Sequence, residues 1–490
     1  MYRRPNPLLI LLFLLCGLGA TASASAAETR SQPNILFILA DDLGHADVGF
    51  NGSDIQTPTL DQLAASGARL QSFYGQQVCT PARAALMTGR YPMRYGLQTF
   101  VVFPAHAYGL PLQERTLPAA LKEAGYKTVM TGKWHLGHYK KAYWPQNRGF
   151  DHFYGSILGE VDYFTKEKAG FVDWQRNGEF LKETGYHTTQ LADEMVRVIA
   201  ADDGKKPLFM YMPFLAPHAP YQAPKAYEDR YPDIQDPTRR TYAGMVTAMD
   251  DSIARVLAAL KQKGMLENTI VVFTSDNGGP LSAEIASGTG GSAAGLKMPA
   301  INAPLRDGKS TLYEGGVRTP TIISWPGHIP AGQVIDEPLH MVDWFPTLIA
   351  QAGGTLDGGK PLDGKDIWPV LTSKAASPHS DILINVEAFR GSVRKGKWKL
   401  LHTATWPQKT ELYDLQADLS EKTNVARDNP AVVEELMAIL DAYGNQQAPS
   451  KWLVSQLRFM KFQGKMLTEE DDGGLAEKQD MGALRMLGGQ

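Results

Sequence analysis

The chain has 490 residues, of which 43% are hydrophobic, and its formal net charge at pH 7 is −3. This length is enough for one large domain with a buried core and a smaller second domain. The nearly neutral charge argues against a nucleic-acid-binding protein. Beyond the N-terminal region, no segment is apolar enough over a sufficient length to suggest a membrane span.

Residues 1–27 are predicted to form an export signal peptide. Two arginines precede an apolar run over residues 8–15, and small residues follow it as a cleavage site. The apolar run is too short to favour a membrane-spanning helix. We therefore expect an exported mature protein, periplasmic or secreted. Because Cys16 lies in the signal, the mature chain would keep one cysteine, Cys79, and could form no intramolecular disulfide.

Four apolar runs are predicted to be buried strands, because continuous apolar segments are typical of parallel sheets that are covered on both faces. These runs are residues 34–40, 127–131, 207–214 and 269–274. Amphipathic helices are predicted between them at residues 59–68, 116–124, 188–200 and 242–263. The alternation predicts an α/β domain over residues 28–372 with a mostly parallel sheet flanked by helices. In such sheets, binding sites form beyond the carboxyl ends of the strands.

The pattern changes after about residue 372. An antiparallel meander is predicted from the segments 381–386, 391–401 and 411–415, and a helix is predicted at residues 430–443. We interpret residues 373–448 as a smaller C-terminal α+β domain with an antiparallel sheet. Residues 449–490 are predicted to be a tail that is helical in part.

Polar residues with hard oxygen atoms follow two of the predicted strands. Asp41 and Asp42 end the first run, and Asp276 and Asn277 follow the last. Such oxygens suit Ca²⁺, or Mg²⁺ with more retained water. The alternative is that they are ordinary loop residues that cap helices or turns. Their repeated placement at corresponding strand ends favours a metal site.

Basic residues follow the other two strands. Lys133 and His135 flank Trp134, and in an extended segment residues two apart point the same way, so both could face one pocket. His218 lies in a loop that is stiffened by prolines on both sides. Each of these residues alone would more often be solvated or paired than functional.

Cys79 stands where a helix is predicted to begin, in the run Cys79-Thr-Pro-Ala-Arg83. A helix N-terminus directs free N–H groups and partial positive charge at its surroundings, which favours an oxyanion there. The alternative interpretation is a small buried residue, since free cysteine is among the most buried types.

Two motifs resemble the type I sulfatases of the alkaline phosphatase superfamily. They are Cys79-x-Pro-x-Arg83, followed by a helix and Thr88-Gly-Arg90, and the segment Gly132-Lys-Trp-His135. The resemblance covers nearly all of the mature chain and is nearest to the arylsulfatase B type, the N-acetylgalactosamine-4-sulfatases. Position 82 is alanine where many relatives have serine, but the core of the motif is kept.

The resemblance implies that a formylglycine-generating enzyme oxidises Cys79 to formylglycine. The hydrated aldehyde would attack sulfur, and the aldehyde would re-form as sulfate leaves. One divalent ion, calcium rather than magnesium, is implied. Its implied ligands are Asp41, Asp42, Asp276, Asn277 and the modified residue at Cys79.

The resemblance also assigns the basic residues. Arg83 and Lys133 would hold the formylglycine hydroxyls, and His135 would be the base that regenerates the aldehyde. His218 and Lys309 would contact the sulfate and stabilise or protonate the leaving oxygen. The long Gly-, Ala- and Ser-rich segment 280–304 precedes Lys309 and could form a lid or a pocket wall.

The implied substrate is a sulfated carbohydrate, with N-acetylgalactosamine 4-sulfate favoured by the likeness to arylsulfatase B. Candidate pocket walls are Tyr163, Phe164, His187 and the segment 280–304. One alternative is a phosphomonoesterase or phosphodiesterase of the same superfamily, with Thr80 as nucleophile, although the second, histidine-rich metal site is not apparent. Another is a non-catalytic sulfated-glycan binder, if Cys79 stays unmodified.

Overall fold

The computed structural model describes Met1 and residues 32–281, 298–459, 461–462 and 465–466. The chain divides into two units, Met1–Gln32 and Pro33–Gln490. Apart from Met1, the predicted signal peptide lies outside the described residues, as do residues 282–297 of the predicted lid and much of the predicted tail. Within the described part of the chain, no helix has both the length and the apolar character that crossing a membrane requires.

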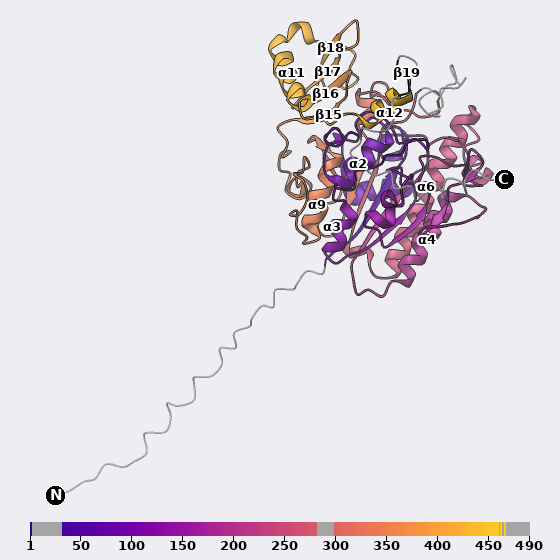
Figure 1. The fold of residues 1–490 in the computed structure, drawn as a ribbon. Coiled ribbons are helices and arrows are strands. Elements are labelled where there is room, and N and C mark those ends of the chain that lie inside the picture. Colours follow the sequence, from indigo (N-terminus) through magenta and orange to yellow (C-terminus); the bar gives the residue numbers. More distant parts are fainter. Residues whose placement is uncertain (2–31, 282–297, 460, 463–464, 467–490) are drawn as a thin grey trace. The chain divides into compact units, whose positions relative to one another are not determined.

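The described residues of the second unit form a ten-stranded mixed sheet (Figure 1). Its strands, in spatial order, are β13 (Gln333–Ile335), β2 (Ala68–Leu70), β12 (Thr321–Ser324), β11 (Thr269–Ser275), β1 (Asn34–Ala40), β10 (Leu208–Pro213), β4 (Lys127–Thr131), β5 (His152–Gly155), β8 (Gln175–Arg176) and β9 (Glu179–Phe180). In the run β11-β1-β10-β4-β5, each strand is parallel to the next. Antiparallel pairs lie on both sides of them. The predicted α/β fold with a mostly parallel central sheet is confirmed, and the four predicted strands are neighbours.

Both faces of this sheet are covered by helices, which explains why β1 is apolar throughout. Side chains alternate between the faces, so Phe37 packs into one core cluster and Ile38 into the other. The first cluster takes in α2 (Cys79–Thr88), α3 (Leu117–Glu123) and α9 (Trp344–Gln351). The second takes in α1 (Pro58–Ser66), α4 (His187–Ala201) and α6 (Pro237–Gln262).

The four predicted helices are present as α1, α3, α4 and α6, with shifted ends. The largest shift is at α6, which begins at Pro237 rather than at residue 242 because the side chain of Asp236 accepts hydrogen bonds from the backbone amides of Thr238 and Arg239. The other α-helices are α5 (Lys225–Glu228), α8 (Glu314–Val317), α10 (Trp368–Ser373), α11 (Pro430–Gly444) and α12 (Lys451–Phe459). Short 3-10 helices are η1 (Gly49–Asn51), η2 (Pro92–Arg94), η3 (Lys141–Tyr143), η4 (Pro145–Arg148), η5 (Leu266–Asn268), η6 (Met341–Asp343) and η7 (Ala426–Asp428).

The predicted antiparallel meander is a four-stranded sheet near the C-terminus of the described chain. Its strands are β15 (Ile382–Val386), β16 (Arg390–Lys395), β17 (Trp398–Thr403) and β18 (Lys409–Asp414), in that spatial order. The run 391–401, predicted as one segment, is two strands because Gly396, with φ of 56°, makes a tight turn within it. Leu436 and Leu440 of α11 are buried with this sheet.

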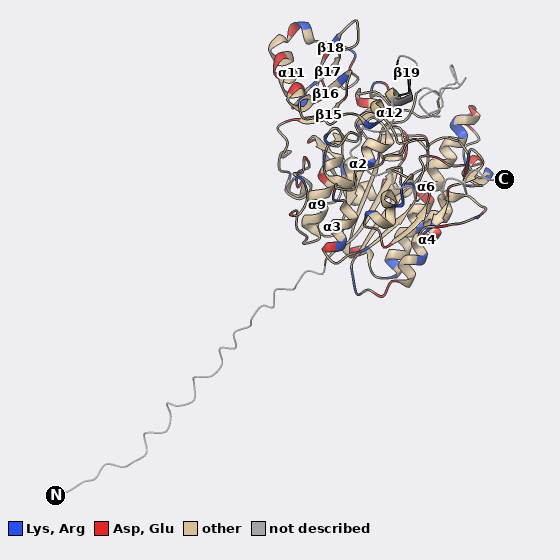
Figure 2. Ribbon diagram, viewed as in Figure 1, with Lys and Arg blue, Asp and Glu red and all other residues tan. Residues whose placement is uncertain are grey.

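Smaller two-stranded pairings complete the described structure: β3 (Phe73–Tyr74) with β14 (Leu339–His340), β6 (Glu167–Lys168) with β7 (Phe171–Val172), and β19 (Lys461–Phe462) with β20 (Lys465–Met466). Figure 2 shows positive and negative residues interspersed along the described elements.

A buried ionic cluster, here called the Lys399 cluster, joins the C-terminal sheet to the chain around α8. Lys399 of β17 lies 2.8 Å from a carboxylate oxygen of Glu314 and 2.9 Å from one of Glu421, and all three side chains are buried. Glu314 also pairs with Arg318 at 3.2 Å. Glu314 and Arg318 therefore stabilise the contact between α8 and the C-terminal sheet.

Candidate active site

The site lies at the carboxyl ends of the four central strands, and backbone hydrogen bonds hold the connecting loops together there. The amide of Asp41, after β1, donates to the carbonyl of Ala216 after β10 at 3.1 Å. The amide of Asp276, after β11, donates to the carbonyl of Ala40 at 3.2 Å. The amide of Lys133, after β4, donates to the carbonyl of Pro213 at 2.8 Å. Polar side chains from segments far apart in sequence therefore converge on one point.

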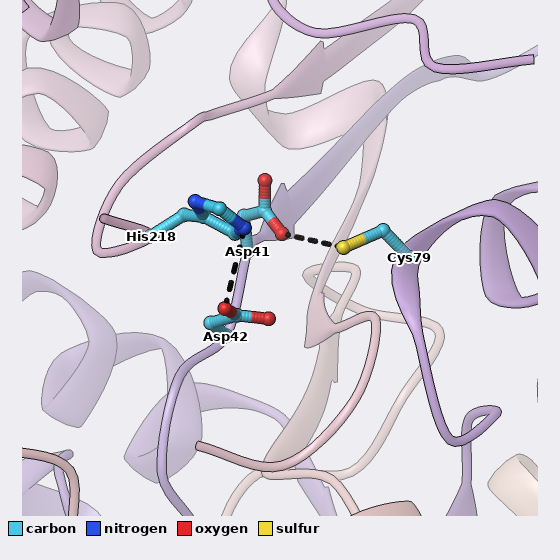
Figure 3. Close-up of side chains that lie close together, drawn as sticks. All are labelled: Asp41, Asp42, Cys79 and His218. Carbon is cyan, nitrogen blue, oxygen red and sulfur yellow. Dashed lines mark hydrogen bonds and ion pairs between the residues drawn. The ribbon is translucent and has the colours of Figure 1, made fainter. Parts of the chain in front are cut away.

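Cys79 is the first residue of α2, a helix whose ten residues are all buried. Its Sγ lies 3.3 Å from Oδ1 of Asp41 (Figure 3). Burial and the charge of Asp41 raise the pKa of the Cys79 thiol, so the unmodified side chain stays protonated and is a weak nucleophile. This environment suits a precursor residue better than a reactive thiolate.

The four predicted oxygen donors meet beside Cys79. Oδ1 of Asp276 accepts from the amide of Asp42 at 3.3 Å, and Nδ2 of Asn277 donates to Oδ1 of Asp42 at 2.8 Å. The Oδ1 atom of Asn277 is buried and has no hydrogen-bond partner. The ligand atoms of Asp41, Asp42, Cys79 and His218 all lie within 4.8 Å of one another. Buried carboxylates and an unsatisfied amide oxygen are donors that Ca²⁺ accepts, so these residues fit a hard divalent ion.

The pKa values of the clustered carboxyl groups indicate that a bound cation would be stabilised there. Burial and the nearby charge of Asp41 raise the pKa of Asp276 to about 7. Asp41 is buried too, but attraction to Lys133 and Arg83 overcomes the burial and holds the pKa of its carboxyl below the usual value. A divalent cation would relieve the repulsion among these groups.

Arg83 and Lys133 bind the carboxylates from the α2 side. The guanidinium of Arg83 donates to Oδ2 of Asp276 at 2.9 Å and to the carbonyl of Lys133 at 3.0 Å. Lys133 forms an ion pair with Asp41, and both side chains are fully buried. Both residues therefore bind carboxylates of the cluster that also contacts Cys79, and their roles stay predictions.

Lys309 and His218 meet at the carboxylate of Asp42. Nζ of Lys309 lies 2.7 Å from Oδ2 of Asp42 and 3.3 Å from Nε2 of His218. Burial alone would lower the pKa of Lys309, but attraction to Asp42 raises it above the usual value, so it stays charged. Burial lowers the pKa of His218 to about 4, so its imidazole is neutral at pH 7.

The long segment before Lys309 returns to the site. The side-chain amide of Asn302 accepts from the amide of Gly279 at 3.0 Å and donates to its carbonyl at 2.8 Å. The amide of Lys309 then donates to the same carbonyl at 3.1 Å. The lid predicted from this segment falls largely on residues 282–297, outside the described residues.

His135 is near the site, but the extended geometry expected for residues 133–135 is wrong. His135 has a φ of 61°, so the backbone turns there, and its Nε2 lies 3.2 Å from the carbonyl oxygen of Val102. Burial holds the pKa of His135 well below its usual value, and its Nδ1 has no partner. Trp134 packs behind, with its ring centroid 6.2 Å from that of Phe150.

The residues predicted as pocket walls differ in burial and in their contacts. Tyr163 is buried, and its hydroxyl donates to the carbonyl of His218 at 2.8 Å, so it fixes the histidine loop. His187 is fully buried and stacks on Tyr163, with centroids 3.9 Å apart, so it is a support beneath the site. Phe164 is 37% exposed. Glu160, which the sequence did not single out, has a carboxylate oxygen 3.8 Å from Nδ1 of His218.

Comparison with known proteins identifies the family. The family model "Sulfatase" matches residues 33–354, and the model "N-sulphoglucosamine sulphohydrolase, C-terminal" matches residues 307–444. The chain belongs to the sulfatase family. The predicted type I sulfatase resemblance and the prediction of a sulfuric ester hydrolase are thereby confirmed at the level of the family.

Three relatives illustrate the range of the likeness. Arylsulfatase J of Mus musculus is 42% identical over 75% of this chain, and the match spans 60% of that relative's length. N-acetylgalactosamine-6-sulfatase of Mus musculus is 35% identical over 85% of this chain and 80% of the relative. The solved structure of Ps i-CgsB in complex with k-i-k-neocarrahexaose has a TM-score of 0.78 and 33% identity, and covers 89% of this chain and 100% of that one. These names do not support the finer likeness to arylsulfatase B.

Proposed function

We propose that the protein is an exported sulfatase that hydrolyses sulfate esters of sulfated carbohydrates, with formylglycine made from Cys79 and one bound Ca²⁺. The observation that carries this proposal is the position of Cys79, whose Sγ lies 3.3 Å from Asp41 at the edge of the buried oxygen cluster. A nucleophile made from this side chain would stand next to the ion that binds the sulfate group.

The charges around Cys79 support an anionic substrate only when a cation is present. Three buried carboxylates, Asp41, Asp42 and Asp276, face three buried cations. When all three carboxyl groups are ionised these charges balance, so the protein alone offers no excess positive charge to a sulfate ester. Calcium held by the carboxylates and Asn277 would supply that charge and polarise the ester. Magnesium, which prefers to keep several waters, suits this closed cluster less well.

The basic residues have environments that suit separate steps. The hydrated aldehyde derived from Cys79 would be the nucleophile, and Arg83 and Lys133 would orient its hydroxyls. Lys309 stays charged beside His218, so the two would bind the sulfate and stabilise the leaving oxygen. His135 is neutral, and its unpartnered Nδ1 would accept the proton that must leave when the aldehyde re-forms.

A carbohydrate substrate is supported by the relatives, whose names include an N-acetylgalactosamine-6-sulfatase and a protein solved with a neocarrahexaose. N-acetylgalactosamine 4-sulfate, suggested by the resemblance to arylsulfatase B, remains one candidate beside 6-sulfated and carrageenan-type sugars. Export through the N-terminal segment and a formylglycine-generating maturation enzyme belong to the same proposal.

The test is sulfate release by purified protein from a panel of defined sulfated saccharides, together with the metal content of the protein. We expect sulfate release from at least one sugar and calcium bound to the protein, with activity lost on chelation and restored by Ca²⁺. Tightly bound zinc with release of phosphate from phosphate esters would contradict the proposal and favour the phosphoesterase alternative. Binding of sulfated sugars without sulfate release would favour the non-catalytic alternative.

A further inference from the structure

Two exposed aromatic side chains lie on neighbouring turns of the C-terminal sheet. Phe389, in the turn between β15 and β16, is 57% exposed, and Trp406, in the turn between β17 and β18, is 93% exposed. The amide of Ala404 donates to the carbonyl of Phe389 at 2.8 Å, so the two turns are adjacent at one end of the sheet. Single exposed apolar residues are ordinary, but two exposed aromatic side chains on adjacent turns point to a ligand.

The Phe389 turn is bound directly to the walls of the active site. Arg390 donates to the carbonyl of Ser310, the residue after the lysine of the site, at 2.8 Å. Glu387 accepts from Nε2 of Gln77, two residues before the predicted nucleophile, at 3.2 Å. The amide of Ser310 donates to the carbonyl of Gln77 at 2.7 Å, which closes this set of contacts. Hydrogen bonds therefore link the turn that carries Phe389 to the segments that carry Cys79 and Lys309.

The chemistry of this surface matches a sulfated sugar chain. Aromatic rings offer a flat apolar face on which the C–H face of a sugar ring can stack. Lys409, the first residue of β18 after the Trp406 turn, pairs with Glu411 at 2.9 Å, so the aromatic faces, rather than a free positive charge, carry the match to a sugar chain. A second protein copy would need a larger continuous apolar patch than two rings.

We propose that Phe389 and Trp406 form a platform that binds sugar rings of a sulfated oligosaccharide, away from the ring whose sulfate is cleaved. The proposal rests on the proposed function, and it adds that the enzyme recognises a chain longer than one sugar. Binding at the platform would act equally on the ground state and the transition state, so it would lower KM for long substrates more than it would raise kcat.

The test compares a sulfated hexasaccharide with the corresponding sulfated monosaccharide, in the wild type and in a double variant with Phe389→Ala and Trp406→Ala. We expect kcat/KM for the hexasaccharide to fall about tenfold, mainly through KM, and kcat/KM for the monosaccharide to stay unchanged. Phe180→Ala is the matched control, because Phe180 is 51% exposed but lies on β9, at the far edge of the ten-stranded sheet.

The outcomes separate the platform from the proposed function. An unchanged kcat/KM for the hexasaccharide, or an equal loss on both substrates, would overturn the platform. If the wild type releases no sulfate from either sugar, the proposed function fails. The platform is then tested by the affinity for the hexasaccharide, measured by calorimetry, and equal affinity of the wild type and the double variant would overturn it. A change of oligomeric state in the double variant, measured by sedimentation, would show a subunit contact instead.

Discussion

Lys399 provides the sharpest test of how much the buried contact between the C-terminal sheet and the chain around α8 stabilises the fold. Replacing it with methionine leaves the carboxylates of Glu314 and Glu421 buried together without the ammonium that lies 2.8 and 2.9 Å from them. Breaking a buried ion pair by removing one partner costs about 3–5 kcal/mol. That is a large share of the roughly 5–15 kcal/mol by which a protein is stable. We therefore expect Lys399→Met to lower the free energy of unfolding by about 3–5 kcal/mol.

The measurement is urea unfolding followed by tryptophan fluorescence, at pH 5 and at pH 8. Attraction to Lys399 opposes the burial that raises the pKa of Glu421, so removing Lys399 raises that pKa further above the value in the unfolded chain. The folded variant then loses more stability as pH rises, and the deficit is larger at pH 8. Lys397→Met is the control, since Lys397 pairs with Asp414 at the surface and should change stability by less than about 0.5 kcal/mol. A loss below about 1 kcal/mol for Lys399→Met, or one independent of pH, would refute the reasoning.

Three further predictions concern single residues. Burial raises the pKa of Glu421 from 4.5 to about 7, so its contribution to stability is present below pH 4.5 and is lost as pH rises towards 7. The free energy of unfolding of the wild type minus that of Glu421→Gln, measured by urea titration, should therefore fall between pH 4.5 and about pH 7. A difference that does not change with pH would be evidence against the raised pKa. Tyr163→Phe removes the hydrogen bond to the carbonyl of His218 and should lower kcat about fivefold in steady-state kinetics, while the circular dichroism spectrum stays nearly the same. An unchanged kcat would mean that this hydrogen bond does not position His218. Lys309→Met should lower kcat by about 10²–10³ because a charged group is lost beside the leaving oxygen, and a change in KM alone would contradict that role.

The central strands could be predicted because their sequence shows their burial directly. Residues 34–40 and 127–131 are strands with the predicted ends, and they are apolar because helices cover both faces of the sheet. The short strands β8 and β9 near one edge of the sheet have two residues each, and a hydrophobic period cannot be recognised over so few residues. The start of α6 lies earlier than the hydrophobic periodicity indicates, and the sequence signal for it is Asp236-Pro237, an N-cap residue followed by proline at the first helical position.

The sequence indicates which residues could gather at the candidate site, but it does not indicate which of them contact one another. Strand ends in a parallel sheet meet at one edge, so Asp41 and Asp276 were expected to lie close together. The turn at His135 was missed because nothing in the sequence marks a φ of 61° at a histidine. The contact of Glu160 with His218 joins two residues without a shared motif, and it emerges only from the folded chain.

The most direct test of the central claim is a mass spectrum of the peptide that contains Cys79, from protein that releases sulfate from a sulfated sugar. The account predicts an aldehyde at position 79, with specific activity proportional to the modified fraction, and no activity in Cys79→Ala. Full activity in protein whose Cys79 is an intact thiol would contradict it.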